Sequence, residues 1–295
     1  MNKLVTVLPP TYNREKYLLK LFKSLSDQTN QGFEWLIVDD GSTDGTEYTV
    51  SKFKGNSTFK ITYIKKENGG KHTALNIGFK KIDTLFTFIV DSDDILTKDA
   101  IQQIYDNAEI VKNNNLCGIS FLRGYSEIKC IGDRFPQDKG ILNGIDIQFR
   151  YKVRGDKAEV WRTDILNKYT FPVFEGEKFQ GENYIWWQIA REYNMLYINK
   201  IIYITEYLEG GLSLSGKKMR IKNPCGGMEN AKMAFFKEFP LLVRIKYSWL
   251  YICYGLFAGE NIQDIVKKSE KASLIIPNLI FGWGLYKYWK TRYGD

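Results

Sequence analysis

The chain has 295 residues, of which 44% are hydrophobic and 26% are charged, so it can form one large or two modest domains and a disordered protein is excluded. Its four cysteines are widely spaced, which argues against a zinc site or a disulfide framework and predicts reduced thiols in the cytoplasm. The net charge of +8 lies in residues 217–295, which hold 14 Lys and Arg against 6 Asp and Glu, and this region predicts an anionic partner.

Strands and helices are expected to alternate in the first part of the chain. Apolar runs predict strands at 4–8, 33–38, 59–64 and 85–90, and apolar residues at helical spacing predict helices at 15–27 and 68–80. This order predicts βαβ units, and therefore an α/β fold with a mostly parallel central sheet flanked by helices. The N-terminus does not read as a signal peptide, and no apolar stretch of about 18 residues predicts a spanning helix.

The pattern loosens after about residue 115. Strands are predicted at 117–122 and 195–204, a strand entering a helix at 160–166, and a helix at 181–190. Residues 217–295 predict a helical, basic and aromatic C-terminal extension. We therefore expect three parts, with bounds 1–115, 116–216 and 217–295.

Polar side chains follow each of the four predicted strands of the first part. The four groups are Thr11-Tyr12-Asn13-Arg14, Asp39-Asp40, Asn68-Gly69-Gly70-Lys71 and Asp91-Ser92-Asp93-Asp94. The carboxyl ends of parallel strands line one crevice, which is where open α/β sheets bind ligands. No Walker A sequence and no Gly-x-Gly-x-x-Gly follows the first strand, which argues against P-loop and dinucleotide sites.

The acidic group at 91–94 predicts a metal site. Carboxylates suit Mg²⁺ or Mn²⁺, and a divalent ion shared with a diphosphate would neutralise a leaving nucleotide. Asp93 or Asp94 could instead cap the next helix. Capping explains one carboxylate, but three on one turn repel each other in the absence of a cation.

These four groups, in this order and spacing, resemble family 2 glycosyltransferases of the GT-A fold. Residues 155–190 look like the acceptor-binding part of bacterial capsule or cell-wall members. The resemblance implies that 1–115 is the nucleotide-sugar-binding half of the GT-A domain and 116–216 the acceptor-binding half. It also implies an inverting transfer of one sugar from a nucleotide-sugar. The Gln-x-x-Arg-Trp signature of processive synthases is absent.

The resemblance also assigns roles to the residues of the crevice. Thr11 and one of Asp39 or Asp40 would read the base, which favours UDP or dTDP because a carboxylate can accept the imide N–H of uracil. Turn capping is the alternative for the two aspartates. The remaining candidates are Asn13 for the nucleotide, Lys71 and Asn76 for ribose and diphosphate, Asp91 for ribose and metal, and Asp93 for metal. A solvated helix end is the alternative for Lys71.

An inverting transfer needs one general base to take the proton of the acceptor hydroxyl. By the resemblance, Glu182 is our candidate, because it precedes the aromatic helix that begins at Tyr184. Many relatives carry Glu-Asp here, whereas this chain has Glu182-Asn183, so the role could move to Glu177. The structural alternative for Glu182 is a carboxylate stabilised by the helix dipole.

The C-terminal segment 273–293 combines apolar residues with Trp, Tyr, Lys and Arg, which suits peripheral contact with the inner face of a membrane. We therefore expect a metal-dependent, inverting enzyme of surface polysaccharide synthesis that acts on a lipid-linked glycan acceptor. The sequence leaves open whether the protein forms a homo-oligomer. A nucleotidyltransferase is the nearest alternative, although it usually needs a glycine-rich loop that is absent here. A basic nucleic-acid-binding protein is the second alternative.

Overall fold

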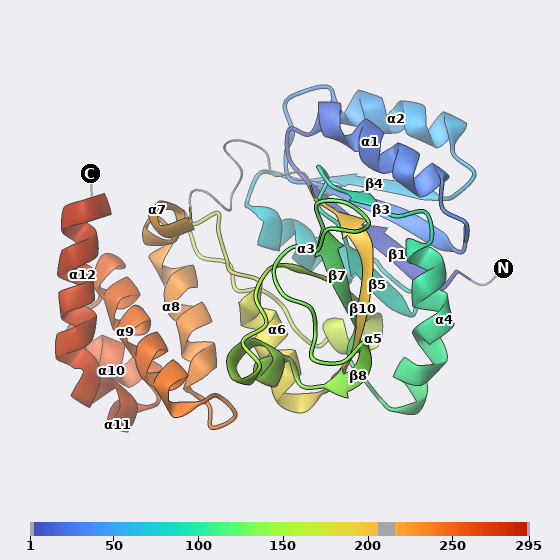
Figure 1. Ribbon diagram of the computed structural model, residues 1–295. Coiled ribbons are helices and arrows are strands. Elements are labelled where there is room, and N and C mark those ends of the chain that lie inside the picture. The colour runs from blue at the N-terminus through green and yellow to red at the C-terminus, as the bar shows by residue number, and fades with distance from the viewer. Residues whose placement is uncertain (1–2, 206–215, 294–295) are drawn as a thin grey trace. The chain divides into compact units, whose positions relative to one another are not determined.

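A computed structural model describes residues 3–205 and 216–293 of the chain, which divides into two compact units (Figure 1). The first unit comprises Met1–Thr170 and Glu192–Tyr207, and the second comprises Phe171–Arg191 and Leu208–Asp295. Residues 116–170 thus share a unit with the first strands, and 171–191 group with the C-terminal helices. The functional division at 115 and 216 stays a prediction.

The first unit is built on one mixed β-sheet, in the strand order β2-β3-β1-β5-β9-β7-β10-β6, with β4 added on β3 and β8 on β10. Parallel pairing joins β1 to β3 and β5, β3 to β2 and β4, and β7 to β10, whereas β9, β6 and β8 pair antiparallel. The strands are β1 Val5–Leu8, β2 Pro10–Thr11, β3 Phe33–Asp39, β4 Ile61–Lys65, β5 Phe86–Ile89, β6 Ile95–Leu96, β7 Gly118–Gly124, β8 Lys139–Leu142, β9 Lys157–Arg162 and β10 Met195–Ile204.

Helices flank this sheet, as the periodicity predicts. They are α1 Glu15–Ser26, α2 Thr46–Asn56, α3 Lys71–Phe79, α4 Ala100–Asn113 and α5 Thr163–Leu166, with a π-helical turn at Asp146–Arg150. One core joins α1, α2 and α4 to alternate side chains of the strands, including Val5, Val7 and Trp35. Alternate residues of a strand face opposite sides of a sheet, so Leu8 belongs to the other face. There Gly78 of α3 lies against Leu8, and a Cβ at Gly78 would be only 2.7 Å from Leu8 Cδ1.

The predicted elements of the first part are therefore confirmed, with boundaries shifted by a few residues. The predicted strand at 59–64 is observed as Ile61–Lys65, and the strand at 85–90 as Phe86–Ile89. The expected α/β class with a mainly parallel sheet is also confirmed. Antiparallel β9 lies between β5 and β7 in the sheet, and the order of elements along the chain did not predict this insertion.

The second unit is helical. It contains most of α6 Asn183–Glu192, followed by α7 Gly216–Ile221, α8 Pro224–Lys232, α9 Leu241–Phe257, α10 Ile262–Ser269, α11 Ala272–Ile275 and α12 Leu279–Tyr293, with short 3₁₀ turns at Met233–Phe235 and Ile276–Asn278. Its core forms where α12 lies along α9, with Trp289 edge-on to Tyr254 at 5.8 Å between ring centroids. Trp187 of α6 packs edge-on against Phe239 and Tyr247. Among the described residues, no helix combines the length and the apolar character needed to cross a bilayer.

Candidate active site

The carboxyl ends of β2, β3 and β5 come together in the first unit, as the sequence predicts. The backbone N–H of Asp40 donates to the Thr11 carbonyl at 2.8 Å, which ties the end of β2 to the end of β3. Asn13 joins the same two loops, because its side-chain oxygen accepts the backbone N–H of Thr43 at 2.9 Å. Asn13 has a φ of 51°, a left-handed conformation that asparagine tolerates better than most residues. Asn13 thus shapes the crevice through its contact with the 42–44 loop.

Asp40 anchors the loop that leads into α3. One of its carboxylate oxygens accepts the Lys66 ammonium at 2.6 Å and the Gly69 N–H at 2.9 Å, and the other accepts the Gly70 N–H at 2.7 Å. The amide of Asn68 adds a further bond at 3.1 Å, and Asp40 is 3% exposed. Gly70 has a φ of 96°, in the region that favours glycine. The turn-capping alternative therefore describes Asp40 well.

Asp39 is fully buried at the end of β3 and has fewer contacts. One oxygen accepts the backbone N–H of Ser42 at 2.8 Å, and the other accepts the hydroxyl of Tyr63 on β4. Burial and the hydrogen bond to Asp39 raise the pKa of Tyr63 well above its usual value, so the phenol stays a donor. Asp39 keeps more capacity to accept a further N–H than Asp40 does. Of the pair, Asp39 is the better candidate to read a base.

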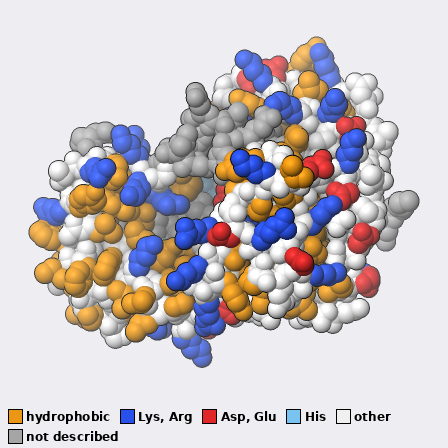
Figure 2. Space-filling view, viewed as in Figure 1, with side chains coloured by type: hydrophobic (Ala, Val, Ile, Leu, Met, Phe, Trp, Pro, Cys, Tyr) orange, Lys and Arg blue, Asp and Glu red, His pale blue; other side chains and the backbone are white. Residues whose placement is uncertain are grey.

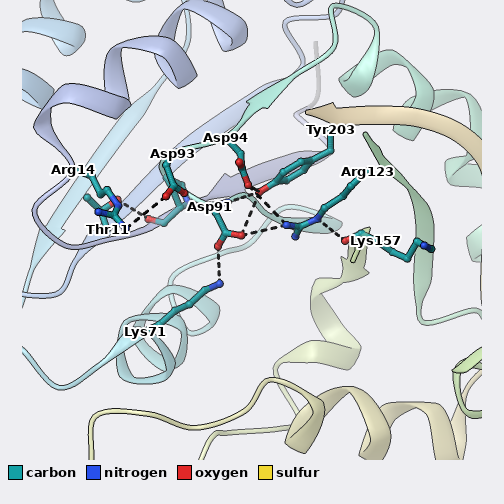
Figure 3. Close-up of polar contacts among 10 residues, drawn as sticks. Thr11, Arg14, Lys71, Asp91, Asp93, Asp94, Arg123, Lys157 and Tyr203 are labelled. Carbon is teal, nitrogen blue, oxygen red and sulfur yellow. Dashed lines mark hydrogen bonds and ion pairs between the residues drawn. The ribbon is translucent and has the colours of Figure 1, made fainter. Parts of the chain in front are cut away.

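Asp91 is held between two cations (Figure 3). One oxygen lies 2.6 Å from the Lys71 ammonium, and the other lies 3.3 Å from the Arg123 guanidinium on β7. Burial by itself would raise the pKa of Asp91, but these two positive charges outweigh it and hold the pKa well below the usual range. Lys71 therefore forms an ion pair with Asp91 in this structure, and it also stands in the first turn of α3. Asn76 is half-buried one turn further along α3.

Tyr203 of β10 fixes the geometry of the acidic turn. Its hydroxyl accepts the backbone N–H of Asp91 at 2.8 Å and donates to the Asp94 carboxylate at 2.8 Å. The Arg123 guanidinium lies over the Tyr203 ring, 4.1 Å from its centroid, and its Nε donates to the Lys157 carbonyl at 2.8 Å. Burial, followed by the charge of Asp91, raises the pKa of Asp94 to about 7. Asp94 is thus a buried structural carboxyl.

The acidic turn does not need a metal ion to offset its charge. Lys71 and Arg123 neutralise Asp91, and Arg14 approaches Asp93 at 3.6 Å. Within residues 3–205 and 216–293, no group of three or more His, Cys, Asp and Glu side chains is arranged to hold a metal. The repulsion argument from the sequence therefore overlooked these protein cations.

A divalent ion still fits Asp93 better than Asp91. The Asp93 carboxylate is 24% exposed and its ion pair with Arg14 is long at 3.6 Å, whereas both oxygens of Asp91 face cations. Mg²⁺ is commonly held by one or two carboxylates together with substrate phosphates. The predicted metal role thus fits Asp93, and a metal bound to Asp91 would first have to displace Lys71 or Arg123.

The two candidates for the general base belong to the second unit. The Glu182 carbonyl accepts the N–H groups of Ile185 and Trp186 at 3.0 and 3.2 Å, so Glu182 stands at the start of α6, as predicted. Glu177 instead caps α8, since its two oxygens accept the N–H groups of Cys225 and Gly226 at 2.7 and 2.8 Å. These bonds explain Glu177 as a structural residue.

Four residues of the site were not among the sequence candidates: Tyr63, Lys66, Arg123 and Tyr203. Tyr63 lies in the middle of β4, Lys66 directly follows that strand, and Arg123 lies near the end of β7. Arg123 follows the predicted strand 117–122, so the rule that polar residues follow strands could have found it. Tyr203 reads as an ordinary apolar strand residue, and its role depends on the sheet order.

Comparisons with known proteins show the family to which the chain belongs. Residues 6–165 match the profile of Glycosyl transferase family 2. TarS of Staphylococcus aureus, a poly(ribitol-phosphate) beta-N-acetylglucosaminyltransferase, is 35% identical over 99 residues, which are 33% of this chain and 17% of TarS. WfgD of Escherichia coli, a UDP-Glc:alpha-D-GlcNAc-diphosphoundecaprenol beta-1,3-glucosyltransferase, is 27% identical over 268 residues, which are 86% of this chain and 94% of WfgD. The chain thus matches less than a fifth of the length of TarS but nearly all of WfgD.

Solved structures with the same architecture carry nucleotide ligands. The structure of S. aureus TarS 1-349 with UDP-GlcNAc covers 98% of this chain and 92% of its own, with a TM-score of 0.61 and 19% identity. The structure of the mannosyltransferase PcManGT from Pyrobaculum calidifontis with GDP-Man and Mn²⁺ covers 99% of this chain and 84% of its own. Its TM-score is 0.57 and its sequence identity is 15%. These neighbours confirm the GT-A fold. Because the family profile spans more than half of the sequence, this protein belongs to glycosyl transferase family 2 and is a glycosyltransferase.

Proposed function

We propose that the enzyme transfers one sugar, with inversion, from a UDP-sugar to a lipid-linked glycan acceptor in bacterial surface polysaccharide synthesis. The observation that carries this proposal is the grouping of Asp39, Lys71, Asp91 and Asp93 at one edge of the sheet. The name of WfgD, of which this chain covers 94%, supports a UDP-sugar donor and a diphosphoundecaprenol-linked acceptor. The UDP-GlcNAc complex of TarS supports the same choice of nucleotide. Family membership speaks against the nucleotidyltransferase and nucleic-acid interpretations.

In this proposal the nucleotide binds by its base and its diphosphate. Thr11 and Asp39 take the base, with the Asp39 carboxylate accepting the uracil imide N–H. Lys71 moves from Asp91 to the diphosphate, because both are anions and the ammonium is at the first turn of α3, where phosphate is favoured. Asn76 and the released Asp91 then face the ribose. Asn13 acts indirectly, by holding the 42–44 loop.

The transfer step needs a base and a stabilised leaving group. Glu182 accepts the proton of the acceptor hydroxyl as the hydroxyl oxygen attacks the anomeric carbon, and the bond from that carbon to the UDP oxygen breaks on the opposite face. Glu177 is less suited to this role because the start of α8 occupies both of its oxygens. Mn²⁺ or Mg²⁺, held by Asp93 and the diphosphate, would neutralise the charge that develops on UDP. Asp91 would join that ion only after Lys71 leaves it.

A donor screen tests this function. Nucleotide-sugars are offered with Mn²⁺ to the wild type, to Asp93→Ala and to Asp83→Ala, an exposed aspartate outside the site, and thermal shift and sugar hydrolysis are measured. We expect a response to a UDP-sugar that Asp93→Ala loses and Asp83→Ala keeps. A response to GDP-sugars alone would contradict the proposed role of Asp39. No response to any nucleotide-sugar by folded protein would refute the function.

A further inference from the structure

Helix α12 carries apolar side chains on its buried side and also on its exposed side. Its inner side carries the buried Gly282 and Trp289, and Trp289 packs edge-on against Tyr254 of α9 at 5.8 Å. The outer side carries Ile276, Ile280 and Trp283, whose exposed fractions are 55%, 72% and 50%. Their spacing of four and three residues places them in one stripe along the 3₁₀ turn and the helix. A helix that covers a core and faces water is normally polar on its outer side.

The same segment is basic and contains no acidic residue. Residues 271–293 include Lys271, Lys287, Lys290 and Arg292 and neither Asp nor Glu. Lys287 lies 5.4 Å from the centre of the exposed Trp283 ring, so a cation stands directly beside the apolar stripe. At the end of the helix, the Arg292 guanidinium donates to the hydroxyl of the exposed Tyr288 at 2.6 Å. Figure 2 shows hydrophobic and Lys or Arg side chains together on the visible face of this unit.

We propose that this outer face, formed by Ile276, Ile280, Trp283, Lys287 and Tyr288, binds the surface of an anionic lipid bilayer. Aliphatic and indole groups enter the boundary between headgroups and acyl chains, and Trp and Tyr are favoured at that depth. Lys and Arg beside them attract the anionic headgroups near the surface. The apolar stripe therefore suits the boundary with the acyl chains, and the adjacent cations suit the headgroup layer of the same membrane surface.

Charge argues against a second copy of the chain as the occupant. In a two-fold contact the same patch meets itself, so the cations of one copy would face those of the other, with no carboxylate within 271–293 to pair with them. Nucleic acid would engage the cations but would leave Ile276 and Ile280 against a phosphate backbone. A lipid surface accommodates both kinds of side chain.

This inference goes beyond the proposed sugar transfer, and its test uses no donor or acceptor. The purified chain of 295 residues is sedimented with vesicles of phosphatidylcholine alone and of phosphatidylcholine with phosphatidylglycerol, at low and high salt. The variants are Ile280→Ser with Trp283→Ser, and Lys287→Gln with Lys290→Gln. Leu19→Ser and Lys139→Gln are matched exposed controls in the first unit.

We expect the wild type to bind the anionic vesicles, and we expect high salt to weaken this binding. The Ile280 and Trp283 pair should weaken it at least tenfold, each removed cation should weaken it about fivefold, and the controls should keep wild-type binding. Thermal unfolding of each variant separates these effects from misfolding. Equal binding by wild type and the Ile280 and Trp283 variant, or no binding to anionic vesicles, would overturn the proposal. A concentration-dependent dimer that the same variant abolishes would reassign the face to self-association.

Discussion

The hydroxyl of Tyr203 lies 2.8 Å from the Asp94 carboxylate, although 109 residues separate them in the chain. The same hydroxyl accepts the backbone N–H of Asp91 at 2.8 Å. One phenol on β10 thus holds both ends of the acidic turn that follows β5. The site therefore depends on the second half of the sheet as well as on the strands that carry its aspartates.

Tyr203→Phe should destabilise the first unit and weaken donor binding. The change leaves the Asp91 N–H and the buried Asp94 carboxyl without their shared partner, which costs about 1–3 kcal/mol. Urea unfolding and UDP titration measure the two effects, with Tyr48→Phe as a control at an exposed tyrosine. If Tyr203→Phe unfolds at the wild-type urea concentration, the bridge is not a structural element.

Asp94 should make stability depend on pH. Folding raises its pKa to about 7, so the folded protein keeps a proton that the unfolded chain loses from about pH 4 upward. This stabilisation is complete below the ordinary carboxyl pKa and is lost as the pH rises through about 7. Asp94→Asn cannot ionise and should gain about 1 kcal/mol or more relative to wild type between pH 4.5 and pH 8.

The measurement for Asp94 is the difference in unfolding free energy between variant and wild type, in metal-free buffer, across that pH range. Asp83→Asn serves as the control at an exposed aspartate, where the difference should stay flat. A flat difference for Asp94→Asn as well would mean that Asp94 is ionised throughout in the folded protein.

Lys71 should contribute to binding of the diphosphate and not of the base. Its ammonium lies 2.6 Å from Asp91, and we propose that it transfers to the donor phosphates. Lys71→Met should therefore weaken UDP binding about tenfold or more, since charge-assisted bonds to phosphate are strong, and leave uridine binding unchanged. Calorimetric titration with both ligands measures this, with Lys80→Met as a control at the exposed end of α3. Equal losses for UDP and uridine would mean that Lys71 acts only by holding Asp91.

Substitutions of Asp40 and Asp39 should have different effects. Asp40→Asn should mainly lower stability, whereas Asp39→Asn should mainly weaken binding of the base. Asp40→Asn removes the charge that pairs with Lys66 and the acceptor for at least one loop N–H, which should cost about 2–4 kcal/mol. Asp39→Asn replaces an acceptor by a donor facing the base and should weaken uridine and UDP alike. Chemical unfolding and ligand titration of both variants provide the comparison. Loss of uridine binding in a fully stable Asp40→Asn protein would exchange the two roles.

The positions of the strands along the chain and the polar residues at their ends could be predicted, because both are local properties. An apolar run marks β5, and the aspartates follow it directly along the chain. Arg123 and Tyr203 could not be assigned in this way, because β7 and β10 reach the acidic turn only through sheet pairing. The insertion of β9 between β5 and β7 sets that geometry, and a long-range antiparallel pairing leaves no local pattern.

The difference between local sequence patterns and tertiary contacts also explains why the sequence argument for a metal site was incomplete. Repulsion within residues 91–94 was correctly inferred from the sequence, but the cations that offset it come from α3, from β7 and from the loop before α1. Their approach depends on tertiary structure. For Glu177 the sequence suggested a catalytic role, as general base, where the structure shows a structural one. Its carboxylate caps α8, which begins nearly fifty residues later in the chain.

The pair Glu182 and Glu177 allows a matched test of the general base. Glu182→Gln removes the proton acceptor and should lower kcat by about 10²–10⁴, with little change in donor KM or in unfolding temperature. Glu177→Gln weakens the cap of α8 and should lower the unfolding temperature, while kcat per folded molecule stays close to wild type. A large loss of kcat in a stable Glu177→Gln protein, with Glu182→Gln active, would move the base to Glu177.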